Sequence, residues 1–295
     1  DHRDLHSFPT RRSSDLLPEY ATLVPDVPTY TANMRLGDDP LAPFHRPPLA
    51  GASNAWAADA SRSATGSTLL ASDPHLGLTA PAIWYLARLQ LSTGGVIGGT
   101  IPGMPLVLAG RSDALGWGIT TAYVDDQDIL LEEVNPDNPN EYRGLDGWNT
   151  FRSRDSIINV KDGAAVTLRL RWTVNGPVMP ADQFNLGTIT PPGHVTAIAW
   201  SALSDRDTSM SAAMAIMRAR TVDNAIEAAA GYISPAQNLT IADRARIAMK
   251  TVGALPARDE RHQSQGRFPS FGYLAENRWK GRFPYADNPE FTDPV

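Results

Sequence analysis

The sequence predicts an α+β fold with a β-rich insertion, and three observations carry this prediction. Short apolar runs of strand length dominate residues 54–121, and a hairpin with alternating apolar side chains follows within residues 156–174. Two alanine-rich segments with helix-capping residues then lie within 208–231. Strands, a β-rich segment and then helices that return to strands are typical of α+β domains rather than of an alternating parallel fold.

The head of the chain is set apart from the fold. Residues 6–16, HSFPTRRSSDL, back-translate without a mismatch to a common sequencing-adapter oligonucleotide, so residues 1–16 are interpreted as an artefact. The alternative is a genuine basic N-terminal arm. Residues 17–52 are rich in proline and predict an extended spacer and precursor remnant. We expect an open-ended fragment of a longer protein.

Residues 53–128 are expected to form the first part of the core. Residues 83–91 fit helical spacing in part but favour a strand. The glycine-dense residues 93–105 lack the lysine of a phosphate loop, which favours a close-packed turn or pocket wall. Short strands are predicted at 106–108 and 117–121, with a polar turn between them.

The predicted insertion spans residues 129–194. Its clearest element is a hairpin with strands at 156–160 and 166–174, joined by a turn that contains Asp162-Gly163. Apolar residues alternate with polar or neutral ones along the second strand, so we expect one face of the hairpin to be buried.

The second part of the core, residues 195–295, contains the predicted helices. Thr208 or Ser209 can cap a helix at 210–220, and a second helix is expected within 221–231, where a glycine ends it. Amphipathic, alanine-rich helices of this kind pack against a sheet.

Composition excludes several classes of function. The net charge is -6 and the pI is about 5.5, which gives no support for nucleic-acid binding. No apolar stretch approaches the roughly 18 residues of a membrane span. The absence of cysteine removes disulfides, thiol catalysis and cysteine-ligated zinc, but does not decide the compartment. GxSxG, HExxH and EF-hand motifs do not occur.

A series of motifs occurs in the order and spacing of one family, the penicillin acylases, which include the acyl-homoserine lactone acylases. The chain resembles this family from about Leu17 to its end. The motifs are GASNAW (51–56), SDPHLG (72–77), IPGMP (101–105), LGWGIT (115–120), DDQD (125–128), SPAQNL (234–239), AD (242–243) and GALPAR (253–258).

The resemblance implies an N-terminal nucleophile hydrolase with a four-layered αββα core. Such proteins are made as one precursor, which excises a spacer to give α and β subunits, and here the β subunit would start at Ser53. Without the motif series, Ser53 would be interpreted as a turn or helix-cap residue. A serine hydroxyl needs an adjacent base, and a free α-amino group with a pKa of about 7.7–8.0 can serve as one.

The resemblance also implies the other site residues. The backbone N–H of Thr121 and the side-chain amide of Asn238 would stabilise the oxyanion, and Arg258 would support Asn238. His75 would touch the nucleophile region and influence processing. The alternative interpretations are a strand threonine, a turn asparagine and a loop histidine.

A structural Ca²⁺ ion is the implied cofactor, and no organic cofactor is expected. Asp125, Asp126 and Asp128 cluster the hard oxygen atoms that calcium prefers. The family's ligands match Asp125, the carbonyl of Gln127, and Asp128. A solvated acidic turn is the alternative, and part of the usual coordination comes from the α subunit.

The expected function is hydrolysis of an amide such as a penicillin side chain or an N-acyl homoserine lactone. The expected partners are this small-molecule substrate and an α subunit from the same precursor, and the family implies export to the periplasm. The alternative is a non-catalytic fragment that acts as a binding or scaffold remnant. The reading frame in the source DNA discriminates the two hypotheses, because an in-frame partner segment upstream and several hundred residues downstream would remove the fragment explanation.

Overall fold

A computed structural model describes residues 52–76, 81–92, 94–182 and 185–293. The adapter-like head and nearly all of the predicted spacer lie outside the described residues. The chain divides into two compact units, which are taken one at a time. One contains described residues 52–128, 199–260 and 278–293, and the other contains 129–198 and 261–277.

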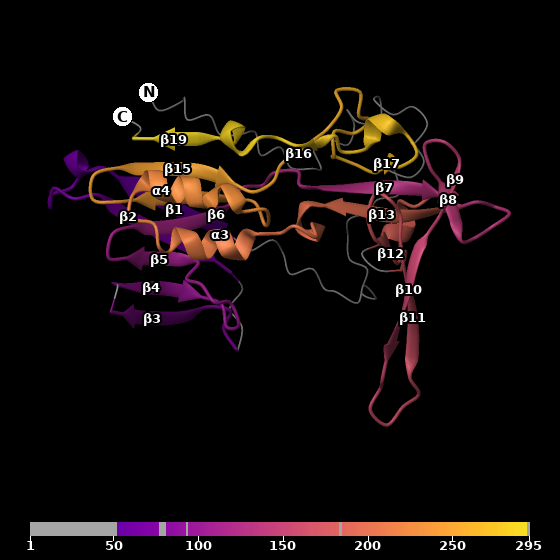
Figure 1. The fold of residues 1–295 in the computed structure, drawn as a ribbon, viewed down its shortest axis with the longest axis horizontal. Helices are drawn as coiled ribbons and strands as arrows, with labels where there is room; N and C mark the ends of the chain where they lie inside the picture. The colour runs from indigo at the N-terminus through magenta and orange to yellow at the C-terminus, as the bar shows by residue number, and fades with distance from the viewer. Residues whose placement is uncertain (1–51, 77–80, 93, 183–184, 294–295) are drawn as a thin grey trace. The chain divides into compact units, whose positions relative to one another are not determined.

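A seven-stranded antiparallel sheet forms the centre of the first unit (Figure 1). Its central pair, β6 and β14, carries two of the predicted site residues, Thr121 and Asn238. In spatial order the strands are β19 (Glu290–Thr292), β15 (Ile247–Val252), β14 (Gln237–Ala242), β6 (Gly116–Thr121), β5 (Ala109–Ser112), β4 (Gly94–Thr100) and β3 (Tyr85–Leu91).

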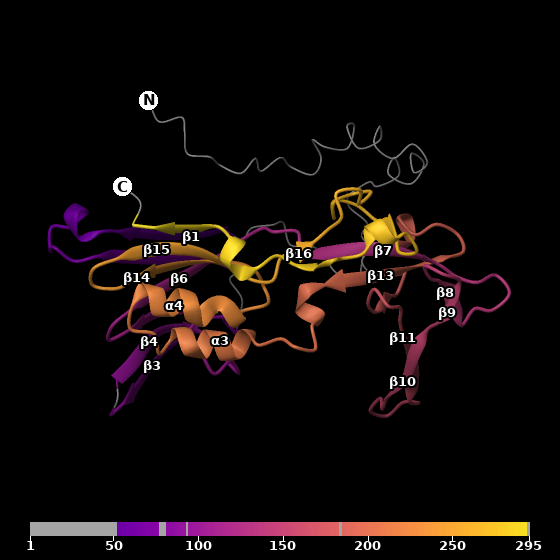
Figure 2. The same ribbon diagram turned by 45° about the horizontal axis from the view of Figure 1, so that its top comes forward.

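Helices cover one face of this sheet (Figure 2). The helices are α3 (Ser209–Ile216) and α4 (Val222–Ala228), which confirms the two predicted helical segments although both are shorter than expected. Thr221 caps α4 by accepting a hydrogen bond from the Asn224 N–H at 3.2 Å. The buried cluster joins Trp117, Leu239 and Ile241 of the sheet to Val222 and Ala225 of α4.

A two-stranded hairpin covers the other face, and it consists of β1 (Ala52–Ala58) and β2 (Leu69–His75). Gly116 and Gly118 face this hairpin, whereas Trp117 between them faces the helices. Helices, sheet and hairpin make three layers in this unit. They fit the predicted α+β class, and the fourth layer of the αββα core stays a prediction.

The second unit holds a four-stranded sheet in the order β12 (Val178–Met179), β13 (His194–Trp200), β7 (Gln127–Glu133) and β17 (Ser270–Phe271). Two hairpins belong to the same unit. They are β8–β9 (Glu141–Arg143 and Trp148–Thr150) and β10–β11 (Arg152–Ile158 and Val166–Trp172). Residues 261–277 belong here, although the sequence placed them in the core.

Two local expectations are wrong. Residues 106–108, which were predicted to form a strand, lie in a loop, and strand β5 follows at Ala109–Ser112. The apolar side chains of Leu106 and Val107 are buried from within that loop. The apolar face of the β10–β11 hairpin is largely exposed, with Leu168 45% accessible. Alternation along a strand shows which side chains share a face but not what covers that face. Among the described residues no helix is long and apolar enough to cross a membrane.

Candidate active site

Ser53 lies on the face of the β1–β2 hairpin that packs on the sheet. It stands directly opposite Pro74 in the antiparallel pairing, so the two side chains share one face. Along β2 the half-buried residues are Leu70, Ser72 and Pro74, and the residues between them are exposed. The Ser53 side chain therefore points toward β6 and β14.

Two glycines in β6 fix the position of the hairpin along the sheet. A Cβ on Gly116 would lie 3.9 Å from the Leu70 Cβ, and a Cβ on Gly118 would lie 2.6 Å from the Ser72 Cβ. Strands β2 and β6 thus run in register, two residues at a time, and Pro74, the next inward residue of β2, lies over Thr120. Ser53, which pairs with that residue, is about 4.8 Å farther across the hairpin.

The predicted oxyanion donors lie at the same end of the sheet. Asn238 pairs with Thr120, and Thr121 pairs with the neighbouring glutamine. The Ala122 N–H donates to the Ala236 carbonyl at 3.3 Å, so Thr121 occupies a non-hydrogen-bonded position and its N–H turns away from β14. The structure brings the strand positions of Ser53, Thr121 and Asn238 together.

Two threonine hydroxyl groups hold the Asn238 side chain. Its Oδ1 accepts from the Thr251 hydroxyl at 2.9 Å, and its Nδ2 donates to the Thr120 hydroxyl at 3.4 Å. Thr251 is buried on β15. Sequence reasoning missed both threonines, and only the pairing of β6, β14 and β15 could have revealed them.

Arg258 does not take the position expected for it. It binds the Asp128 carboxylate through Nε at 3.0 Å and Nη2 at 2.8 Å, and Nη2 also donates to the Asp125 carbonyl at 2.9 Å. The Trp279 indole N–H donates to the same carboxylate at 2.5 Å. The support of Asn238 by Arg258 is therefore not reproduced, because the guanidinium neutralises a buried carboxylate.

The described residues at positions 125–128 do not by themselves fit a calcium ion. The Asp128 side chain is 3% exposed and already forms an ion pair with the Arg258 guanidinium. Asp126 accepts from both the backbone N–H and the hydroxyl of Ser201, at 3.1 and 3.2 Å. Among the described residues, no three acidic or histidine side chains gather as a metal site would need. Calcium at Asp125, Gln127 and Asp128 stays a prediction.

His75 lies on the opposite face of the hairpin from the Ser53 side chain. It pairs with Ala52, one position before the nucleophile, and β2 alternates so that His75 and Asp73 are exposed. Its Nε2 is 2.8 Å from the Asp73 carboxylate, and both side chains are about half exposed. The structure brings His75 to the predicted cleavage point but not to the Ser53 hydroxyl.

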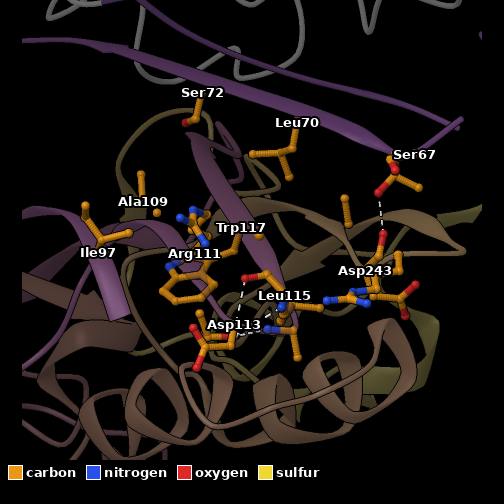
Figure 3. Close-up of a pocket in the computed structure, with 17 residues that line it drawn as sticks. Ser67, Leu70, Ser72, Ile97, Ala109, Arg111, Asp113, Leu115, Trp117 and Asp243 are labelled. Atoms are coloured by element: carbon orange, nitrogen blue, oxygen red, sulfur yellow. Dashed lines mark hydrogen bonds between the residues drawn. The ribbon is translucent and has the colours of Figure 1, made fainter. Parts of the chain in front are cut away.

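A cavity of about 500 Å³ lies at the other end of the hairpin (Figure 3). It is lined by Ser72, Arg111 and Gly116, and Gly116 lies about 17 Å along β6 from Thr121. Burial alone would raise the pKa of Asp243 in its wall, but the backbone N–H groups of residues 222, 245 and 246 lower it overall. The lowered pKa makes this carboxylate a weaker base than an ordinary aspartate.

Comparisons with known proteins identify related acylases. Acyl-homoserine lactone acylase QuiP from Pseudomonas aeruginosa is 28% identical over 251 residues, which are 82% of this chain and 29% of that protein. Penicillin G acylase from Escherichia coli is 28% identical over 247 residues, 82% of this chain and 27% of that protein. The chain thus spans less than a third of the length of these relatives.

The structure resembles thermostable penicillin G acylase from Alcaligenes faecalis, with a TM-score of 0.72 and 26% identity. The similarity covers 82% of this chain and 42% of that one. The family model for penicillin amidase matches residues 4–295. The chain belongs to the penicillin amidase family.

Proposed function

We propose that this chain carries the nucleophile of a self-processing amidohydrolase, and that cleavage between Ala52 and Ser53 creates it. The observation that carries the proposal is the register of four strands, β1, β2, β6 and β14. It places Ser53 on the inner face of the hairpin, over the end of the sheet where Thr121 and Asn238 lie. A nucleophile and two hydrogen-bond donors at one point are what acyl transfer needs.

The proposed reaction starts with the Ser53 hydroxyl, which attacks the amide carbonyl. The liberated α-amino group takes the hydroxyl proton through a water molecule, and the Thr121 N–H and the Asn238 amide stabilise the tetrahedral oxyanion. The proton passes to the leaving amine as the carbon–nitrogen bond breaks and an acyl ester forms on Ser53. Water then hydrolyses the ester and releases the acid.

The proposed substrates are small acyl amides. The names of the relatives indicate two kinds, penicillins and N-acyl homoserine lactones, and both place a linear amide between an acyl group and a lactam- or lactone-bearing amine. A panel of acyl chain lengths and aromatic acyl groups would identify the preferred acid. Export to the periplasm and an α subunit from the same precursor belong to the proposal.

The test compares wild type with Ser53→Ala, expressed from the complete gene. Wild type should show a new N-terminus at Ser53 by intact mass and should release acid from a chromogenic acyl amide, whereas Ser53→Ala should do neither. Ser63→Ala, which removes a half-buried hydroxyl in the connection between β1 and β2, is the matched control. Continued cleavage and turnover in Ser53→Ala would contradict the proposal.

A non-catalytic remnant of such an enzyme is the second candidate. The neighbouring coding sequence discriminates the two. In-frame segments upstream and downstream that supply the rest of a penicillin acylase would favour the enzyme, and stop codons on both sides would favour the remnant.

A further inference from the structure

A carboxamide side chain can sit in its site in two orientations that differ only by exchange of its oxygen and nitrogen. The exchange matters for Asn238, because only the NH₂ group can donate to an oxyanion. Whatever fixes the orientation of the Asn238 amide therefore determines whether the proposed site has its second donor.

The contacts of Asn238 are unequal on its two sides. On the β15 side, Oδ1 meets the Thr251 hydroxyl at 2.9 Å, a full-strength hydrogen bond. On the β6 side, Nδ2 meets the Thr120 hydroxyl at only 3.4 Å. The NH₂ group is thus held weakly, and it lies on the side of β6, the strand that carries Thr121.

Thr251 is itself held firmly. Its backbone N–H donates to the Pro289 carbonyl at 2.9 Å, and its own carbonyl accepts from the Asn288 side chain at 3.1 Å. Thr251 is 5% exposed and Asn288 is 4% exposed, so water does not compete freely for these groups. The segment before β19 thereby fixes the position of the hydroxyl that binds Asn238.

We infer that Thr251 is a positioning residue, whose hydroxyl donates to Asn238 Oδ1 and so directs the amide NH₂ toward the Ser53 end of β6. The inference rests on the proposed function and deepens it. Without the donor, the amide samples both orientations, and in one of them an oxygen lone pair faces the developing negative charge.

The first experiment removes only the hydroxyl. Thr251→Val keeps the shape of the side chain, and it should lower kcat for a chromogenic acyl amide about tenfold, less than the 10²–10³-fold typical of losing an oxyanion donor, with little change in KM. Thr251→Ser retains the donor and should stay within about twofold of wild type. Thr240→Val, a buried threonine on the same face of β14, is the matched control and should leave kcat unchanged.

A double-mutant cycle with Asn238→Ala tests whether Thr251 acts through Asn238. Thr251→Val should lower kcat in the wild-type background and should have no further effect once Asn238 is alanine. An equal loss in both backgrounds, or no loss in either, overturns the inference. If Thr251→Val does not fold, Thr251→Ala replaces it in the cycle, and its loss of kcat should likewise disappear once Asn238 is alanine. Thr251→Ser keeps the hydroxyl, so a loss of kcat in that variant overturns the inference. A folded wild type that releases no acid contradicts the proposed function instead.

Discussion

The close approach of the hairpin to the sheet at Gly118 makes a sharp prediction. A Cβ at this position would lie 2.6 Å from the Ser72 Cβ and 2.7 Å from its Oγ. Ordinary contact begins at 3.4 Å, so Gly118→Ala must push β2 away from β6 by about 0.8 Å, the difference between 3.4 and 2.6. Because β1 pairs with β2, Ser53 would move with it.

A shift of this size should damage catalysis more than stability. Misplacement of a reacting group by about 1 Å can cost about 100-fold in rate, whereas overpacking costs about 1–3 kcal/mol of folding free energy. We expect Gly118→Ala to lower kcat about 10- to 100-fold and to lower the melting temperature by a few degrees. Acid release and thermal unfolding, measured on the same sample, separate the two effects.

Two further variants control this experiment. Gly116→Ala changes the same face of the same strand, but its Cβ would meet nothing nearer than 3.8 Å, so kcat should be unchanged. Ser72→Gly in the Gly118→Ala background should restore much of the lost rate, and the buried Ser72 hydroxyl has no hydrogen-bond partner among the described residues to lose. Normal kcat in Gly118→Ala, or failure of Ser72→Gly to restore it, would refute the register.

Three other predictions follow from the same unit. A calcium ion at Asp125, Gln127 and Asp128 must displace the Arg258 guanidinium, so calcium chloride should raise the melting temperature and EDTA should lower it if the ion binds, and neither should change it if Arg258 keeps Asp128. Asp243→Ala should destabilise the fold by about 1 kcal/mol at pH 7, because the backbone N–H groups of residues 222, 245 and 246 lose the carboxylate that accepts their hydrogen bonds. The folded-state pKa of Asp243 is lowered, so its contribution is full above the ordinary value of 3.8 and is lost as the pH falls through the folded-state pKa. The difference in melting temperature between wild type and Asp243→Ala should be smaller at pH 3 than at pH 7. An equal difference at the two pH values would contradict this linkage. His75→Ala should slow release of the Ser53 N-terminus but leave acid release by the cleaved protein within about twofold, because the imidazole faces away from the hydroxyl. A mass-spectrometric time course measures the cleavage, and the activity assay measures acid release by the same sample.

The sequence proposes residues for the candidate site but does not predict their contacts. The motif series selects Ser53, Thr121 and Asn238 because local spacing is preserved within each motif. Contacts between motifs depend on strand pairing across more than a hundred residues, as in the bond from Asn238 to Thr120. No local pattern encodes that register.

The glycine-rich segment shows a second limit. A turn or pocket wall is the natural expectation for residues 93–105, yet Gly94–Thr100 forms strand β4. A Cβ on Gly98 would lie 2.2 Å from the Ala109 carbonyl oxygen, so glycine permits the close approach of β4 and β5. Composition shows that glycine is needed but not whether a turn or a neighbouring strand needs it.

Arg258 and Asp128 pair with each other in this structure, whereas the sequence assigned Arg258 to Asn238 and Asp128 to a calcium ion. A buried carboxylate and a guanidinium satisfy each other where they lie within reach. Their pairing leaves Asn238 Oδ1 to the Thr251 hydroxyl, which is neutral and directional. If Arg258→Gln is made, the carboxylate loses its cation while the bond from Thr251 to Asn238 remains. Stability should therefore fall, and kcat per folded molecule should hold. Unchanged stability with a lower kcat would contradict this reasoning and would indicate that Arg258 supports Asn238.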